Sequence, residues 1–298
     1  MRLSAGLPLT LLWAVSTDAL NTYRPRNVGL EKRLSNEEKC KLTFETTDLD
    51  VVAKTWKDSG ADAFLTAWIL KYGASDWDSE IIRTMVSGGE GGSTIDCQNF
   101  PVDNACRPPN PGSCKTFIHP EMFFIQESMG NLYGMFSGMH EDLQDYVIEQ
   151  LASGIKDVVA DFASPKANNQ VMTMLIGAFV TAAGAAGPFW VAGAPLTFAV
   201  GIFNFIAGAI NSKPPDLDAN GTLEKQLGDV FERAKNELQS AIIGFFSGVM
   251  GDTILLGPQF GGLKVTNVFS DGKFLSSKIT DAARNSWQKA ATHQMVSV

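Results

Sequence analysis

The chain has 298 residues, 45% of them hydrophobic, and its 24 basic and 32 acidic residues give a net charge of −8. This composition is ordinary for a folded protein. The acidic balance argues against nucleic acid as a partner, because phosphate binding needs a basic surface, and also against simple electrostatic docking on anionic lipid.

The first residues have the pattern of an export signal. A basic start, Met1 and Arg2, precedes an apolar stretch over residues 3–15. About a dozen residues are too few to span a bilayer but suit the apolar region of a signal peptide. Small residues allow cleavage after Ser16 or Ala19, so we predict a signal peptide over residues 1–19. An N-terminal anchor and a buried first helix are the alternatives.

A second processing site is expected shortly afterwards. Residues 20–30 are polar and lack periodicity, and Lys32 and Arg33 follow them directly before a helix that we expect to be capped near Ser35. The dibasic pair resembles a substrate of the kexin-type Golgi protease of fungi, although it could be an ordinary solvated pair. We predict a pro-segment over 20–33 that ends at this site. Without residues 1–33, 19 basic and 30 acidic residues remain, a net charge of −11.

Four cysteines follow in the first part of the remaining chain: Cys40, Cys97, Cys106 and Cys114. In an oxidising compartment an even count predicts two disulfides, here with three possible pairings. A zinc site is the competing interpretation, but the closely spaced cysteine pair of such sites is missing. Residues 93–116 are rich in proline and lack periodicity, so we expect an irregular loop that the disulfides hold in place.

Apolar residues at three- and four-residue spacing predict helical regions over 48–72, 75–86, 119–162, 223–250 and 276–291. The first is expected to break near Gly60. The third is expected to be amphipathic, with acidic residues such as Asp142 on its outer face and a bend between Gly130 and Gly138 or at Gly154.

We therefore expect a mainly α protein in which residues 34–298 form a single helical domain. Its parts are a cysteine-containing region over 34–116, a helical bundle over 117–252 and a C-terminal extension over 253–298. Short apolar runs at 264–269 and 273–275, separated by turn residues, suggest a small hairpin within the extension.

The most unusual feature is a run of 46 residues without charge, from position 167 to position 212. Two apolar helices, 171–187 and 189–210, are expected here as a hairpin over 171–210, and each is close to the length that crosses a bilayer. The side chains that we expect to engage a membrane are Val171, Gly177, Phe179, Phe189, Trp190, Phe198, Phe203 and Phe205.

Three interpretations of this hairpin compete. It is the buried centre of a soluble bundle, a permanent pair of transmembrane helices, or a sheltered segment that inserts into a target membrane. The flanking residues Lys166 and Lys213 belong to no basic cluster, and the neighbouring amphipathic helices each need an apolar partner. These features favour the first or third interpretation over the second.

No catalytic, metal or cofactor motif stands out. The sequence after His140 departs from the H-E-x-x-H zinc motif, and the chain lacks the G-x-S-x-G motif of hydrolases. Asp76 and Asp78 are two residues apart at a helix start and should point to different faces, which argues against a glycosidase pair. Asn220 begins a glycosylation sequon. The histidines are scattered, at His119, His140 and His293.

Beyond these patterns, the layout resembles uncharacterised secreted proteins of filamentous fungi. The shared features are the signal peptide, tryptophans in the N-terminal helices (Trp56, Trp68 and Trp77), the loop between Cys97 and Cys114, and a central apolar region. The resemblance covers roughly residues 40–250. It implies a fungal source and a role outside the cell, but no activity or site residue.

For function we therefore expect a secreted, non-enzymatic protein, an effector or toxin-like protein whose partner is a target-cell membrane or a host surface protein. The alternatives are a surface protein anchored by two transmembrane helices and a secreted enzyme of unrecognised type. A convergent polar cleft would favour the enzyme.

Overall fold

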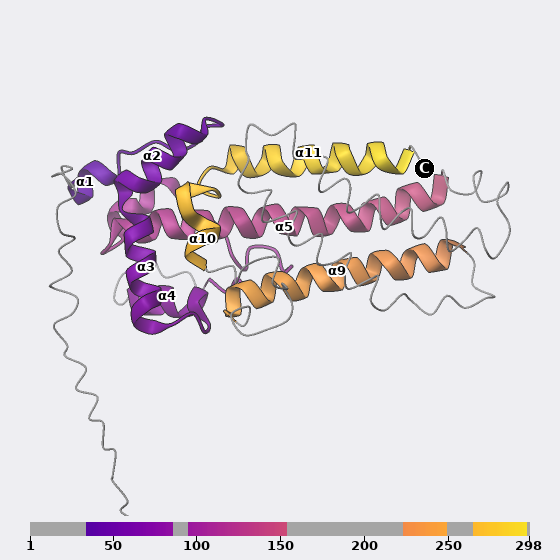
Figure 1. Cartoon of the computed structure of the whole chain (residues 1–298), viewed down its shortest axis with the longest axis horizontal. Coiled ribbons are helices and arrows are strands. Elements are labelled where there is room, and N and C mark those ends of the chain that lie inside the picture. Colours follow the sequence, from indigo (N-terminus) through magenta and orange to yellow (C-terminus); the bar gives the residue numbers. More distant parts are fainter. Residues whose placement is uncertain (1–33, 86–94, 154–222, 249–264, 297–298) are drawn as a thin grey trace, which may run out of the picture. The chain divides into compact units, whose positions relative to one another are not determined.

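The computed structural model describes residues 34–85, 95–153, 223–248 and 265–296, which contain helices and no strand (Figure 1). The prediction of a mainly α fold is therefore confirmed. The helices are α1 (Asn36–Lys39), α2 (Leu49–Ser59), α3 (Ala61–Tyr72), α4 (Trp77–Met85), α5 (Pro120–Ser153), α9 (Leu223–Ser247), α10 (Val265–Phe269) and α11 (Ser277–Val296), with 3-10 turns η1 (Pro111–Thr116) and η5 (Ser270–Gly272).

The N-terminal helices begin and end where local chemistry requires. Ser35 caps α1: its hydroxyl accepts a hydrogen bond from Glu38 N, and the Glu38 carboxylate accepts one from Ser35 N. The predicted break between α2 and α3 lies at Gly60, whose φ of 78° is in the left-handed region that favours glycine. Both boundaries expected from the sequence are thus confirmed.

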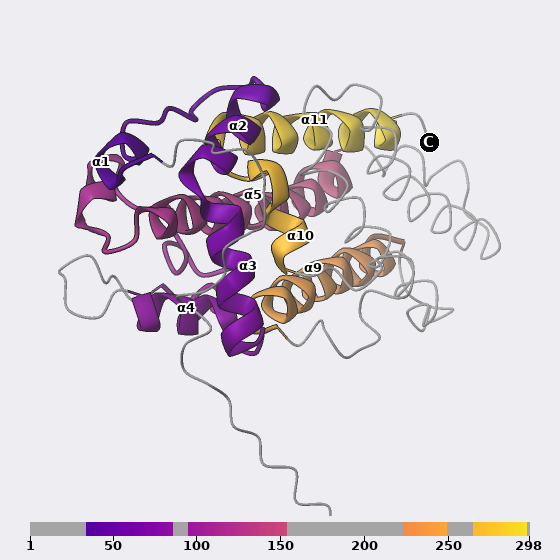
Figure 2. The same ribbon diagram turned by 60° about the vertical axis from the view of Figure 1, so that its left-hand side comes forward.

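Helix α5 is the centre of the described structure. It contacts α2, α3, η1, α9 and α11, and every residue from Met122 to Tyr133 is buried. Figures 1 and 2 show α5 lying between α9 and α11. The expectation of a polar outer face is wrong for this part of the helix, because partners cover it on all sides.

The three long helices have defined directions. Tyr133 of α5 packs near Phe246 of α9 with ring centroids 6.4 Å apart, whereas His140, two turns later, is within electrostatic range of Lys235. Residue numbers therefore rise along α5 as they fall along α9, so the two helices are antiparallel. Helix α11 is parallel to α5, because Asn131 bonds the residues just before α11 and Asp142 bonds Arg284.

Two glycines of α5, Gly130 and Gly138, allow neighbouring segments to pack close to the helix. Helix α5 is continuous through Gly130 and Gly138. A Cβ atom at Gly130 would lie 2.2 Å from the backbone nitrogen of Pro108, and one at Gly138 would lie 2.3 Å from the guanidinium of Arg284. Both glycines therefore allow close packing, and the bend predicted between them stays a prediction. Gly154 lies outside the described residues.

The expected hairpin over 264–275 is wrong, because Val265–Phe269 forms helix α10 and Ser270–Gly272 forms the turn η5. The apolar residues of α10 recur at helical spacing and are buried. One of them, Phe269, joins a cluster around Trp77 together with Phe245, at centroid distances of 5.9 and 5.8 Å from the tryptophan. Burial in this cluster replaces the strand pairing that a hairpin would need.

Candidate functional site

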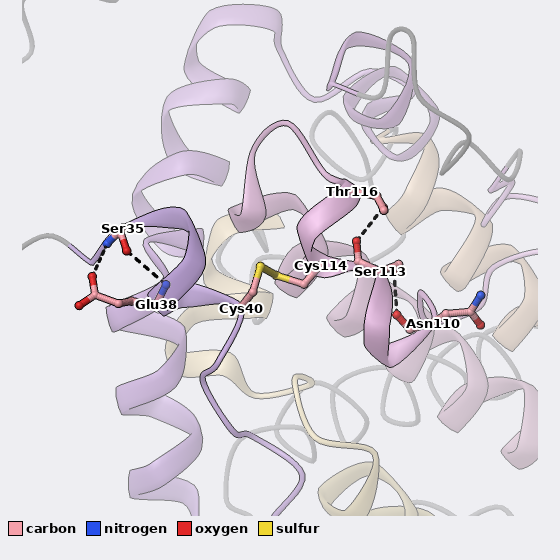
Figure 3. Close-up of a disulfide and its surroundings, with 7 residues drawn as sticks. All are labelled: Ser35, Glu38, Cys40, Asn110, Ser113, Cys114 and Thr116. Carbon is pink, nitrogen blue, oxygen red and sulfur yellow. Dashed lines mark hydrogen bonds between the residues drawn. A yellow bond between two sulfur atoms is a disulfide. The ribbon is translucent and has the colours of Figure 1, made fainter.

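Two disulfides settle the pairing that the sequence leaves open. Cys40 is bonded to Cys114 and Cys97 to Cys106, so the zinc alternative is excluded. The first bond joins the end of α1 to η1, as Figure 3 shows. On the η1 side, the Ser113 hydroxyl donates a hydrogen bond to the Asn110 carbonyl at 2.7 Å. The predicted irregular loop is thus covalently attached to the start of the domain.

The second disulfide closes a short turn that α5 and α9 both hold. The Tyr133 hydroxyl of α5 lies 2.9 Å from the carbonyl oxygen of Asn99 and 2.8 Å from that of Val102. Gln239 of α9 donates to the carbonyl of Phe100 at 2.9 Å. Burial raises the pKa of Tyr133 to about 12, which keeps the hydroxyl protonated as a donor. The turn is therefore fixed to two of the three long helices.

The carboxylates of Asp76 and Asp78 meet at one side chain. Gln98 Nε2 lies 3.3 Å from Asp76 Oδ1 and 2.8 Å from Asp78 Oδ1. We had expected the two acids to point to different faces, and this is wrong because Asp76 has a φ of 47° and precedes the regular helix. Burial raises the pKa of Asp78, and its Oδ2 is buried without a hydrogen-bonding partner. The arrangement attaches α4 to the disulfide turn.

A buried ion pair links α5 to α11. Asp142 accepts hydrogen bonds from Arg284 Nε at 2.9 Å and from Arg284 Nη2 at 2.8 Å, and Gln288 Nε2 adds a third at 2.7 Å. The Asp142 bonds raise the pKa of Arg284. The prediction that Asp142 lies on an outer face is wrong, because α11 covers this part of α5 and supplies the matching cation.

A second polar group is buried at the start of α11. Glu127 is 7% exposed on α5, and Asn131, one turn later, donates to the carbonyl oxygens of Phe274 and Leu275 at 3.1 Å each. Burial, followed by the charge of Glu45, raises the pKa of Glu127 to about 8. At neutral pH Glu127 is therefore mainly uncharged.

The histidines occupy separate places in the fold. The exposed His119 packs against Phe64 at a centroid distance of 5.3 Å, whereas His140 is half-buried edge-on to Phe100 at 5.7 Å. Burial, followed by the charge of Lys235, lowers the pKa of His140. His293 lies in α11. Over the described ranges no three His, Cys, Asp or Glu side chains are grouped so that they could hold a metal ion.

Several predicted site residues lie outside the described residues. They are the processing residues Ser16, Ala19, Lys32 and Arg33, the sequon residue Asn220, and the membrane-engaging candidates Val171, Gly177, Phe179, Phe189, Trp190, Phe198, Phe203 and Phe205. Among the helices that the structure describes, none combines the length and apolar character needed to cross a membrane.

The described helices on either side of the uncharged run can nevertheless be placed. The chain leaves the described structure at Ser153, the last residue of α5, and returns at Leu223, the first residue of α9. Because α5 and α9 are adjacent and antiparallel, these two residues lie at the same end of the pair (Figure 1). The Cys40–Cys114 disulfide joins α1 to η1, and the turn closed by Cys97–Cys106 packs beside Tyr133 and His140 near the middle of α5.

No family model, curated protein or solved structure matches this chain. The function must therefore be argued from the chain's own residues.

Sequence reasoning missed the buried polar residues of α5, although one signal was present. Phe123, Glu127 and Asn131 are spaced by four residues and so share one face of the helix. Polar residues that continue an apolar stripe point to a buried polar contact. The partners Glu45 and Arg284 come from distant parts of the chain and carry no such signal.

Proposed function

We propose that this chain is an exported, non-enzymatic protein that engages a target membrane through its apolar segment over residues 171–210. The observation that carries the proposal is the combination of 46 uncharged residues with their place in the fold. In sequence they lie between Ser153, where α5 ends, and Leu223, where α9 begins, and these two residues are at the same end of an antiparallel helix pair.

Export is supported by the N-terminal sequence pattern and by the disulfides. Disulfides form and persist mainly in oxidising compartments, so Cys40–Cys114 and Cys97–Cys106 are compatible with an extracellular protein. Both disulfides join segments that precede α5 in sequence, and among the described residues no disulfide ties α9 or α11.

Processing after Arg33 is part of the same proposal. The capping box of Ser35 starts the first helix, α1, shortly after Arg33. N-terminal sequencing of the protein secreted by a fungal host should give Leu34 as the first residue. Replacing Lys32 and Arg33 by alanine should retain the pro-segment, and an unchanged N-terminus would contradict this part of the proposal.

The membrane proposal is tested with dye-loaded liposomes of neutral and anionic composition over a range of pH. The secreted protein should release the dye, and Phe198→Asp should reduce the release strongly, because an aspartate at the centre of a membrane helix costs about 3 kcal/mol. Leu70→Asp is the matched control, since Leu70 is already 82% exposed on α3. Absence of leakage under every condition would refute membrane engagement, as would equal leakage by the two variants.

A separate measurement distinguishes the proposed protein from a permanently anchored one. Fractionation of a culture should place the secreted protein in the medium. Recovery only in the membrane fraction would favour a surface protein with two transmembrane helices.

A further inference from the structure

The two disulfides differ in how far their cysteines are buried. Cys97 and Cys106 are 0% and 3% exposed and Cys114 is 4% exposed, whereas Cys40 is partly exposed. Exchange with a thiol requires the attacking thiolate to reach one sulfur atom of the bond. In the folded protein Cys40 therefore offers a point of attack on the first disulfide, while both cysteines of the second are covered.

The charged side chains beside the two bonds differ as well. Next to the first disulfide lie two pairs of opposite charge, Lys39 with Glu121 and Lys41 with Glu37, and the exposed Lys115. Around the second disulfide the charges are mainly acidic: Asp76, Asp78, Asp96 and Asp103, with the exposed Arg107 directly after Cys106. A thiolate is an anion, so acidic surroundings oppose its approach. Burial and charge therefore both favour attack on the first bond.

Helix α1 is attached to other elements through two neighbouring residues. The Cys40 disulfide joins its C-terminal end to η1 (Figure 3), and Lys39 forms an ion pair with Glu121 of α5. Backbone hydrogen bonds at this end of α1 are local: Cys40 N donates to the carbonyl of Asn36 at 3.2 Å, and Leu42 N donates to the carbonyl of Lys39 at 3.0 Å. Opening of the disulfide would remove the covalent part of this attachment.

The second turn has attachments that do not depend on its disulfide. The hydroxyl of Tyr133 and the side chain of Gln239 bind its carbonyl oxygens, and Gln98 binds a carboxylate of α4. Within the turn, Asp96 N donates to the carbonyl of Ala105 at 2.9 Å. These bonds hold the turn on α4, α5 and α9, so a reductant reaches its sulfur atoms only after a larger opening of the fold.

We infer that Cys40–Cys114 is a redox-sensitive tie, which a small thiol such as glutathione opens while Cys97–Cys106 stays intact. The thiolate of the reductant forms a bond to Cys40 Sγ, and Cys114 leaves as a thiolate that takes up a proton. A second reductant thiolate then displaces Cys40 from the mixed disulfide. The products are two protein thiols and one oxidised, disulfide-linked reductant. Reduction thereby releases α1 from η1.

The partly exposed bond also closes the larger loop. Cys40 and Cys114 are 74 residues apart, against 9 for the other pair, so chain entropy assigns the first bond the larger share of stability. Its reduction therefore loosens α1 and weakens the domain together. The inference does not rest on the proposed membrane activity, because every residue involved lies in the described part of the chain.

The test treats the folded secreted chain with reduced glutathione at neutral pH. Free thiols are alkylated at intervals and located by peptide mass spectrometry. Cys40 and Cys114 should be alkylated faster than Cys97 and Cys106 by about tenfold or more, because a buried sulfur is reached only through opening of the fold. The transient glutathione adduct should be on Cys40. Equal rates for the two pairs, or an adduct on Cys114, would overturn the inference.

Unfolded protein provides the control. In concentrated guanidinium chloride the two bonds should be reduced at similar rates, because the fold no longer covers either of them. A difference as large as that in the folded chain would overturn the explanation by burial.

Hydrogen exchange then measures the release of α1. After reduction and alkylation of the first bond, amides of residues 39–42 and 113–117 should lose protection, whereas those of residues 96–105 should keep it. Unchanged protection over 39–42 would overturn the release, and an equal loss in the second turn would overturn a local tie. The double variant Cys40→Ala and Cys114→Ala should show the same pattern without reductant. Should it fail to fold, the alkylation rates of the wild type decide.

Discussion

Arg284 and Asp142 form a two-point ion pair in which Nε lies 2.9 Å from Oδ2 and Nη2 lies 2.8 Å from Oδ1. The carboxylate belongs to the central helix α5 and the guanidinium to α11, so the pair connects residues 142 positions apart. Gly138, one turn before Asp142, provides the space for the guanidinium. Gly138 and Asp142 on α5 and Arg284 on α11 therefore depend on one another.

Asp142→Asn should lower the free energy of unfolding by about 3 kcal/mol, because it leaves a partly buried guanidinium without its counter-charge. Glu141→Gln is the control: its carboxylate is exposed and 3.9 Å from Arg284, so a change below about 1 kcal/mol is expected. Denaturant unfolding at pH 7 measures both. Similar losses of unfolding free energy in the two variants would contradict a stabilising role of the Asp142–Arg284 ion pair between α5 and α11.

Glycines on α5 should respond to alanine in opposite directions. Gly130→Ala should destabilise the protein by about 1–3 kcal/mol, because the new Cβ would lie 2.2 Å from the backbone of Pro108. Gly134→Ala should stabilise it by about 0.5–1 kcal/mol, since a Cβ there meets nothing within 4 Å and alanine favours the helix. Thermal unfolding distinguishes the two, and equal signs would contradict the assigned packing role.

The two disulfides should differ in their contribution to stability. Cys40 and Cys114 are 74 residues apart, whereas Cys97 and Cys106 are 9 apart. Loop-closure entropy predicts a loss of about 4.5 kcal/mol when the first pair is replaced by alanine and about 2.7 kcal/mol for the second. Unfolding of the two double variants tests this order. A larger loss from the short loop would indicate that native contacts, rather than chain entropy, determine the difference.

Gln98→Glu would place a third carboxyl group beside Asp76 and Asp78. We expect a loss of about 2 kcal/mol at pH 7, because a partly buried hydrogen-bond donor is replaced by a like charge beside the buried Asp78. The loss should become smaller as the pH is lowered, because burial raises the pKa of Asp78 and its protonation removes one of the like charges. Asn99→Asp, at the exposed neighbouring residue, is the control and should change little. A loss that does not vary with pH would contradict the electrostatic explanation.

Much of the helical architecture could be predicted because it depends on local signals. The break at Gly60, the cap at Ser35 and the start of α11 near Ser276 each follow from residues close in sequence. The failed hairpin over 264–275 shows the limit of such signals, because a short apolar run fits a strand or a buried helix equally well. The segment forms helix α10, and its Phe269 packs against Trp77, almost two hundred positions away in the sequence.

Polar contacts in the core could not be predicted from spacing. In the sequence, Asp142 lies on the acidic face of the predicted helix, where a solvent-exposed side chain is expected. In the structure, α11 packs over it and Arg284 pairs with it. Glu127 likewise is buried in the fold, and its unfavourable neighbour Glu45 precedes it by 82 positions. Long-range partners of this kind leave no periodic signal, because the sequence separation between them is arbitrary.

By itself, the sequence determined the mainly α class, the break at Gly60, the number of disulfides and the uncharged run over 167–212. The helical class follows from the short-range spacing of apolar residues, and the break follows from the backbone freedom of glycine. The number of disulfides and the uncharged run follow from counting cysteines and charged residues. Only the tertiary structure decided which cysteines pair, that α5 is the central helix, and that Ser153 and Leu223, the described residues on either side of the uncharged run, lie at one end of an antiparallel pair. Each of these depends on how helices distant in sequence pack together, which is set by the burial of whole apolar faces.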